Sequence, residues 1–146
     1  MTTLLVDTSV LIKWFHDEGE PDLAEARAIR DATRREELRT LVIDLALYEM
    51  GNVLLRALHW KGSDVADQLD DLVLICGAPV AMSGELFRKA AEIGASHGLS
   101  FYDAAWAAAA ELIGVSLVSA DARLLAAGLA ESPRAAARRL RLRAGT

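Results

Sequence analysis

Short apolar runs alternate along this chain with longer stretches in which apolar residues recur at helical spacing. The runs LLVD (4–7), TLVI (40–43), APVAM (78–82) and VSLVS (115–119) predict short buried strands. The stretches predict helices over 8–16, 22–38, 45–60, 64–76, 84–97, 101–113 and 122–130. Strands that alternate with helices indicate βα units and a parallel sheet covered on both faces. We therefore predict an α/β fold, a three-layer α/β/α sandwich with a short parallel sheet.

The size and composition fit one soluble domain. The chain has 146 residues, of which 53% are hydrophobic, and its charges are spread along its length. The longest uncharged stretch, Leu72 to Gly84, is too short to span a membrane. The start, MTTLLVDTS, lacks the basic residues of a signal peptide. The single cysteine, Cys76, cannot form an internal disulfide. We expect a cytoplasmic protein with no membrane partner.

The net charge of −5 is unevenly distributed. Residues 134–146 contain five arginines and no acid, whereas residues 1–133 carry 11 basic and 21 acidic groups. This contrast predicts a main domain over 1–133 and a basic Arg-rich tail over 134–146. An acidic body is not the usual signature of simple nucleic-acid binding, although cations can mediate the approach of phosphate.

Four acids, distant in sequence, are expected at one edge of the predicted sheet. Asp7 ends the first strand and Asp121 follows the last. Glu49 lies about a turn and a half into the helix after TLVI. Asp103 lies in the first turn of the helix before VSLVS, and that helix runs antiparallel to the strand it enters. Because open α/β sheets place their sites at the carboxyl ends of strands, the four carboxylates can meet there.

Each acid also has a structural explanation. Ser100 and Asp103 have the spacing of a capping box, and Asp121 could cap the helix that follows it. Glu49 could belong to a solvated polar stripe. Asp7 is the hardest to explain structurally, since it closes a buried strand. Taken singly, each acid is as easily structural as functional, whereas a chance convergence of four is much less expected.

Four converging carboxylates would need a cation, because they repel one another and some would otherwise be protonated. Mg²⁺ and Mn²⁺ prefer oxygen ligands, and one or two such ions can lower the pKa of a water that attacks a phosphodiester. A site with no histidine or cysteine argues against zinc and indicates phosphoryl chemistry.

Four segments together resemble a known family. DTSVL (7–11), YEMGNVL (48–54), GLSFYDA (98–104) and SADARL (119–124) are similar, in this order and spacing, to PIN-domain proteins. They are most similar to the ribonuclease toxins of VapBC toxin–antitoxin pairs. The resemblance implies a PIN-like nuclease domain over 1–133. It also implies a metal-dependent endoribonuclease, a homodimer that cleaves RNA and is silenced by a cognate small antitoxin protein.

The resemblance assigns roles by position. Asp7, Glu49, Asp103 and Asp121 match the family's catalytic, metal-binding acids. Ser9 and Ser119 match its supporting hydroxyls, with Ser119 in place of the more usual threonine. The sequence departs from the family after Ser132-Pro133, where RAAARRLRLR replaces a last short apolar strand.

The Arg-rich tail has two interpretations. One is a solvated or disordered terminus. The other is a basic arm that grips RNA phosphates flanking the cleaved bond, because the body is acidic. The residues of this hypothetical arm are Arg134, Arg138, Arg139, Arg141 and Arg143.

Two other functions are compatible with parts of the pattern. One is a catalytically inert PIN-like binding module, which a missing acid would favour, but all four acids are present. The other is a phosphoaspartyl hydrolase or receiver-type domain with Asp7 phosphorylated. That interpretation is disfavoured because Asp7 is followed by Thr8 and Ser9 rather than a second carboxylate, and no lysine follows VSLVS.

Overall fold

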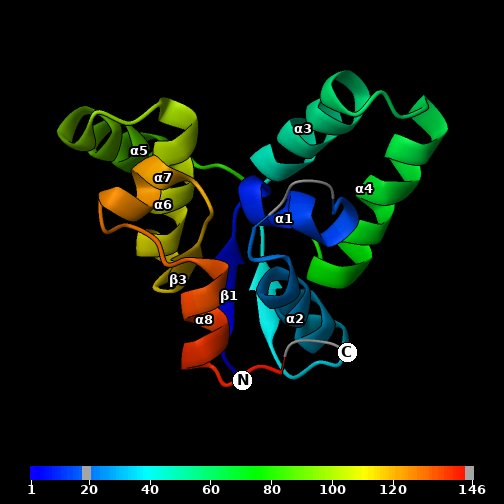
Figure 1. Cartoon of the computed structure of the whole chain (residues 1–146). Coiled ribbons are helices and arrows are strands. Elements are labelled where there is room, and N and C mark those ends of the chain that lie inside the picture. The colour runs from blue at the N-terminus through cyan, green and yellow to red at the C-terminus, as the bar shows by residue number, and fades with distance from the viewer. Residues whose placement is uncertain (18–20, 144–146) are drawn as a thin grey trace.

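A parallel sheet lies between two groups of helices in the computed structural model, which describes residues 1–17 and 21–143 (Figure 1). The strand order is β2 (Arg39–Leu41), β1 (Thr3–Val6) and β3 (Ser116–Val118), and both pairings are parallel. Leu4, Leu5 and Val6 of the central strand are fully buried, as expected for a strand covered on both faces. The α/β prediction is confirmed.

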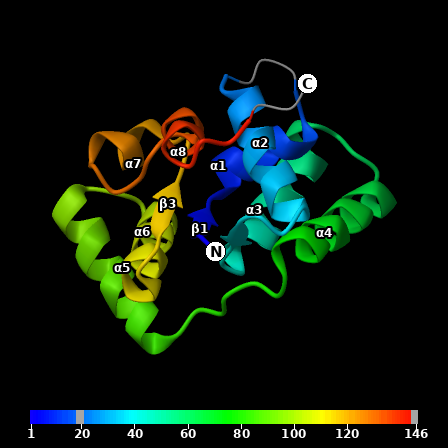
Figure 2. The same ribbon diagram turned by 90° about the horizontal axis from the view of Figure 1, so that it is seen from below.

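Helices connect all the strands. They are α1 (Thr8–Phe15), α2 (Leu23–Arg34), α3 (Leu45–Asn52), the π-helix η1 (Val53–Ala57), α4 (Gly62–Cys76), α5 (Gly84–His97), α6 (Phe101–Ile113), α7 (Ala122–Ala126) and α8 (Pro133–Arg139). Helices α5 and α6 pack against each other, and α6 packs against β3. Figures 1 and 2 both show this pair on one side of the strands and α3 with α4 on the other. No helix in the described part of the chain is long and apolar enough to cross a membrane.

Several predicted elements differ in extent. The helix predicted over 22–38, for example, ends at Arg34. The segment APVAM contributes one isolated bridge, between Val80 and Ile43, rather than a strand. The helix predicted over 45–60 continues as the π-helix η1 and ends at Ala57. The helix predicted over 122–130 ends at Ala126. Gly128 adopts a φ of +71°. Its N–H donates to the Leu125 carbonyl, and Leu129 N–H donates to the Leu124 carbonyl, so the helix ends in a Schellman motif.

The Arg-rich segment is not a detached tail over its first half. Ser132 accepts a hydrogen bond from Ala135 N–H at 3.1 Å and begins α8. Helix α8 packs on α2 and buries Ala136 and Ala137. Just before α8, Glu131 forms a single parallel bridge with Val118. The packed domain therefore extends past the predicted boundary at residue 133, at least as far as Arg139.

Candidate active site

Asp7 is a buried carboxylate whose hydrogen bonds are not those of a helix cap. It occupies the N-cap position of α1, but its side chain makes no capping hydrogen bond. Ser9 Oγ donates to one carboxylate oxygen and Ser119 Oγ to the other, each at 2.5 Å. The side chain is only 4% exposed. Helix capping therefore does not explain the acid that ends β1.

The two serines bind the strand ends to each other. Ser9 Oγ accepts from Ala120 N–H at 2.9 Å, and Ser119 Oγ accepts from Asp121 N–H at 3.0 Å. Each hydroxyl thus accepts from the segment that follows β3 while it donates to Asp7. The network fixes the carboxyl ends of β1 and β3 around one acid, and it places both serines beside Asp7 as their sequence positions predicted.

Burial changes the acidity of Asp7. It raises the pKa of the Asp7 carboxyl from 3.8 to about 6, against the lowering effect of the hydrogen bonds from Ser119 and Ser9. The charge of Glu49 adds a smaller upward contribution. Without a cation, Asp7 is therefore harder to ionise than an exposed aspartate and keeps its proton up to about pH 6.

Glu49 faces Asp7 from α3 and is held by two donors from other helices. Its Oε1 accepts from Thr8 Oγ1 at 3.0 Å and from the indole Nε1 of Trp106 at 3.1 Å. A solvated polar stripe would not place this carboxylate against a buried tryptophan. The sequence patterns identified neither Thr8 nor Trp106 as a donor to Glu49. The one signal in the sequence was that Trp106 lies one turn after Asp103, on the same side of α6.

Asp103 and Asp121 have the structural roles that the sequence suggested and also face the cavity. Ser100 Oγ accepts from Asp103 N–H at 3.1 Å, which caps α6. Asp121 Oδ1 caps α7 by accepting from the N–H groups of Arg123 and Leu124. Burial, and then the charge of Asp121, raise the pKa of Asp103, while Ser100 and Arg123 lower it. At both Asp103 and Asp121, a role at a helix N-terminus is therefore compatible with a position in the cavity wall.

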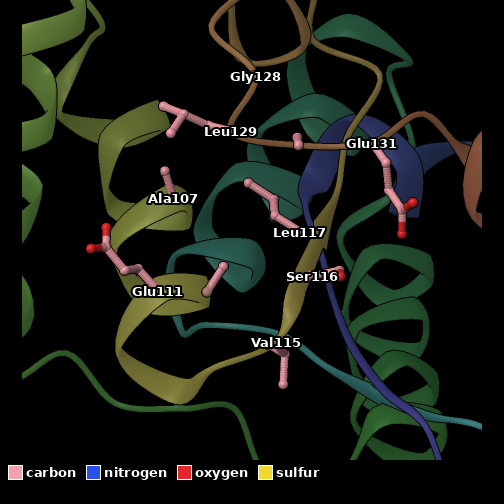
Figure 3. Close-up of a pocket in the computed structure, with 10 residues that line it drawn as sticks. Ala107, Glu111, Val115, Ser116, Leu117, Gly128, Leu129 and Glu131 are labelled. Atoms are coloured by element: carbon pink, nitrogen blue, oxygen red, sulfur yellow. The ribbon is translucent and has the colours of Figure 1, made fainter.

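All four predicted acids line one cavity of about 300 Å³. Its lining residues are Asp7, Thr8, Ser9, Ile12, Glu49, Val53, Asp103, Trp106 and Asp121. A separate cavity of about 370 Å³ lies between α6 and β3 and includes Glu111 and Glu131, but none of the four acids (Figure 3). The convergence predicted from the sequence thus occurs at the carboxyl ends of the strands.

The donor set of the acid-lined cavity suits a hard divalent cation, because it offers carboxylate and hydroxyl oxygens and no lysine or arginine among the described lining residues. Electrostatic coupling groups the acids as Asp7 with Glu49 and Asp103 with Asp121. Within residues 1–17 and 21–143, no three acidic, histidine or cysteine side chains lie close enough to hold one ion as they stand. An ion would therefore have to draw the two pairs together.

The five arginines do not share one environment. Arg134 pairs with Asp22 at 3.2 Å, and Arg139 pairs with Glu131 through Nε at 3.1 Å. Helix α8 ends at Arg139, and Arg141 has a φ of +54°. No single helical face therefore joins Arg134, Arg138 and Arg141. Arg138, Arg141 and Arg143 are exposed.

Comparison with known proteins finds the same family along most of the chain. The PIN domain family matches residues 4–129. A relative from Pyrobaculum aerophilum named Ribonuclease VapC3 is 33% identical over 130 residues, covering 83% of this chain and 91% of the relative.

Solved structures share the fold. The crystal structure of PAE2754 from Pyrobaculum aerophilum aligns with a TM-score of 0.66 at 26% identity, covering 96% of this chain and 97% of that one. A toxin–antitoxin complex from Klebsiella pneumoniae aligns with a TM-score of 0.66 at 17% identity, covering 89% and 97%. At that identity the second likeness is evidence of the fold alone.

Proposed function

Because this chain belongs to the PIN-domain family, we propose that it is a metal-dependent endoribonuclease and the toxin of a type II toxin–antitoxin pair. The observation that carries the proposal is the convergence of Asp7, Glu49, Asp103 and Asp121 on one cavity. The name of the Pyrobaculum relative, Ribonuclease VapC3, supports RNA as the substrate. Membership of this family leaves the receiver-type alternative without support.

The four acids would hold one or two Mg²⁺ or Mn²⁺ ions. When bound, such an ion neutralises phosphate charge, lowers the pKa of a water and stabilises the departing oxygen. Asp7 is the central ligand in this proposal, because two hydroxyls fix both of its oxygens in place. Asp121 keeps Oδ2 available, since only its Oδ1 caps α7.

The residues around the acids would orient the site. Ser9 and Ser119 prevent Asp7 from rotating, because each donates to a different oxygen of the same carboxylate. Ile12 and Val53 contribute apolar wall to the cavity and restrict the access of bulk water. The described lining also lacks a histidine that could act as a general base in a metal-free mechanism.

The protein partners in this proposal are a cognate small antitoxin and a second copy of the chain. Exposed aromatic side chains support a protein contact, because Tyr48, Phe101 and Tyr102 surround an apolar cavity of about 280 Å³ on α3 and α6. A cytoplasmic location belongs to the same proposal. Co-expression with the product of a neighbouring reading frame, followed by mass measurement of the purified complex, tests both partners.

The test of the reaction is the chemistry of the product ends. Purified protein should cleave single-stranded RNA with Mg²⁺ or Mn²⁺ and stop when EDTA is added. Attack by water predicts fragments with 5′-phosphate and 3′-hydroxyl ends, which mass spectrometry identifies. Fragments with 2′,3′-cyclic phosphate ends would instead indicate attack by the 2′-hydroxyl of the RNA and would contradict the proposal.

A further inference from the structure

Glu49 differs from the other three acids in how it is held. Asp7 is bound by serines close to its own strand ends, and Asp103 and Asp121 lie in the first turns or caps of their own helices. The side chain of Glu49 instead projects from α3 and receives its hydrogen bonds from α1, through Thr8, and from α6, through Trp106. Its position therefore depends on two elements other than its own.

Both donors bind the same oxygen. Thr8 Oγ1 lies 3.0 Å and Trp106 Nε1 lies 3.1 Å from Glu49 Oε1. Among the described residues, no hydrogen bond reaches Oε2. One oxygen of the carboxylate is thus fixed by the protein, and the other is left for a ligand in the cavity.

The buried indole N–H of Trp106 requires a hydrogen-bond acceptor. The residue is 2% exposed and its indole can only donate, so the N–H needs an acceptor inside the protein. Trp14 offers an internal contrast, because its indole N–H is also buried but has no hydrogen-bond partner among the described residues. The N–H of Trp106, in contrast, is directed at a candidate ligand.

We propose that Trp106 and Thr8 are positioning residues that hold Glu49 so that its second oxygen faces the cation. The inference rests on the proposed function, because it assumes that Glu49 is a metal ligand. Glutamate has three side-chain torsions, and holding one oxygen in place removes the entropic cost of ordering them when the ion binds. Partners that orient metal ligands in this way contribute about 10- to 100-fold to metal affinity or activity.

The first experiment compares Mn²⁺ affinity by calorimetry and electron paramagnetic resonance. Trp106→Phe removes the indole N–H and keeps an aromatic ring in the core, and Trp14→Phe is the matched control. We expect Mn²⁺ affinity to fall about 10-fold in Trp106→Phe and to stay unchanged in Trp14→Phe. Thr8→Val should weaken binding as well, and Thr8→Ser should restore it because the hydroxyl returns.

A spectroscopic measurement separates positioning from general packing. Nuclear magnetic resonance of the ¹⁵N-labelled protein should show an indole N–H signal that disappears in Trp106→Phe. Substoichiometric Mn²⁺, which is paramagnetic, should broaden this signal before that of Trp14. Glu49→Gln should weaken Mn²⁺ binding, and adding Trp106→Phe to it should cause little further loss, since the residue that Trp106 positions is already changed.

Each outcome decides for or against the positioning role. Wild-type Mn²⁺ affinity in folded Trp106→Phe and Thr8→Val proteins would overturn the inference and leave the proposed function intact. Failure of the wild-type protein to bind Mn²⁺ or cleave RNA would overturn both. If Trp106→Phe does not fold, the comparison of Thr8→Val with Thr8→Ser decides between the outcomes, because Thr8 is only partly buried.

Discussion

The acid-lined cavity and the Arg-rich C-terminal segment carry opposite charges, and they differ in whether the protein pairs those charges with groups of opposite sign. In the cavity, Asp7 and Glu49 are hydrogen-bonded by hydroxyl and indole donors, and no described lysine or arginine lines the walls. In the segment, by contrast, Arg134 and Arg139 are already paired with acids of the same chain.

The difference separates charge kept for a ligand from charge used by the fold. Burying an uncompensated carboxylate is destabilising, as the raised pKa of Asp7 shows, and the proposed function has a cation meet the need to offset the four negative charges. The paired arginines have no such need. Only Arg138, Arg141 and Arg143 remain exposed and outside these ion pairs, so the hypothetical RNA-binding arm is smaller than its sequence suggests.

The largest expected effect comes from neutralising an acid of the cavity. Asp103→Asn should reduce RNA cleavage at least about 100-fold, because a metal ion supplies several kcal/mol of charge stabilisation. Glu111→Gln is the matched control, since Glu111 is an acid of the same helix that pairs with Lys89 outside the cavity. Cleavage rates measured with Mg²⁺ check it. Full activity of Asp103→Asn would remove that acid from the site.

The next effect concerns stability without metal. The pKa of Asp7 is raised to about 6 in the folded protein, so ionisation of this buried group opposes folding. The penalty is absent below about pH 4, grows through pH 6 and is complete above pH 7. Asp7→Asn should therefore stabilise the protein at pH 7.5 in EDTA, with an upper limit of about 3 kcal/mol, and lose this advantage at pH 4.

Denaturant unfolding of both proteins across this pH range measures the effect. The hydroxyls of Ser9 and Ser119 can rotate to serve an amide, which keeps the comparison close to a change of charge alone. A gain that is the same at pH 4 and pH 7.5 would show that repulsion and burial of charge at Asp7 are not its cause.

A smaller effect is expected from the exposed arginines. If Arg138, Arg141 and Arg143 contact single-stranded phosphates, replacing all three with Gln should flatten the slope of log K against log salt by about 2. The measurement is RNA binding over a salt series in an inactive Asp103→Asn background. An unchanged slope and affinity in a folded protein would leave these arginines with no part in holding RNA.

The smallest effect concerns the paired arginines. Arg134→Gln and Arg139→Gln break partly exposed ion pairs, which typically contribute less than about 1 kcal/mol. Their cost should appear in thermal unfolding at low salt and diminish at high salt. Loss of RNA binding comparable to that of the exposed set would erase the distinction between the two groups.

The sequence predicted the elements that carry strong local signals. Asp7 and Asp121 follow apolar runs that predicted buried strands, and strand ends in a parallel sheet lie together. Ser100 marked the start of α6 correctly, because its hydroxyl caps that helix. The positions of Asp7, Asp103 and Asp121 followed from these local signals and from the rule that sites in parallel sheets lie at the carboxyl ends of the strands.

The remainder depended on tertiary contacts that sequence patterns do not contain. The position of Trp106 one turn after Asp103 does not by itself mark it as a donor to Glu49, because Glu49 and Trp106 are 57 positions apart and an indole at helical spacing is usually core. The segment around Val80 has a strand-like pattern but makes one bridge. Helix α8 was not predicted, because its arginines indicated a basic tail. Ala136 and Ala137 nevertheless form the apolar face that packs on α2.

Whether the four acids hold a divalent cation is decided by locating the ion. Crystals of the protein grown or soaked with Mn²⁺ should give an anomalous difference peak in the cavity of Asp7, Glu49, Asp103 and Asp121, with all four carboxylates directed at it. The peak should be absent from crystals of Asp7→Asn. A protein that cleaves RNA in Mn²⁺ while its only ordered ion lies away from these carboxylates would contradict a metal site built from the four acids.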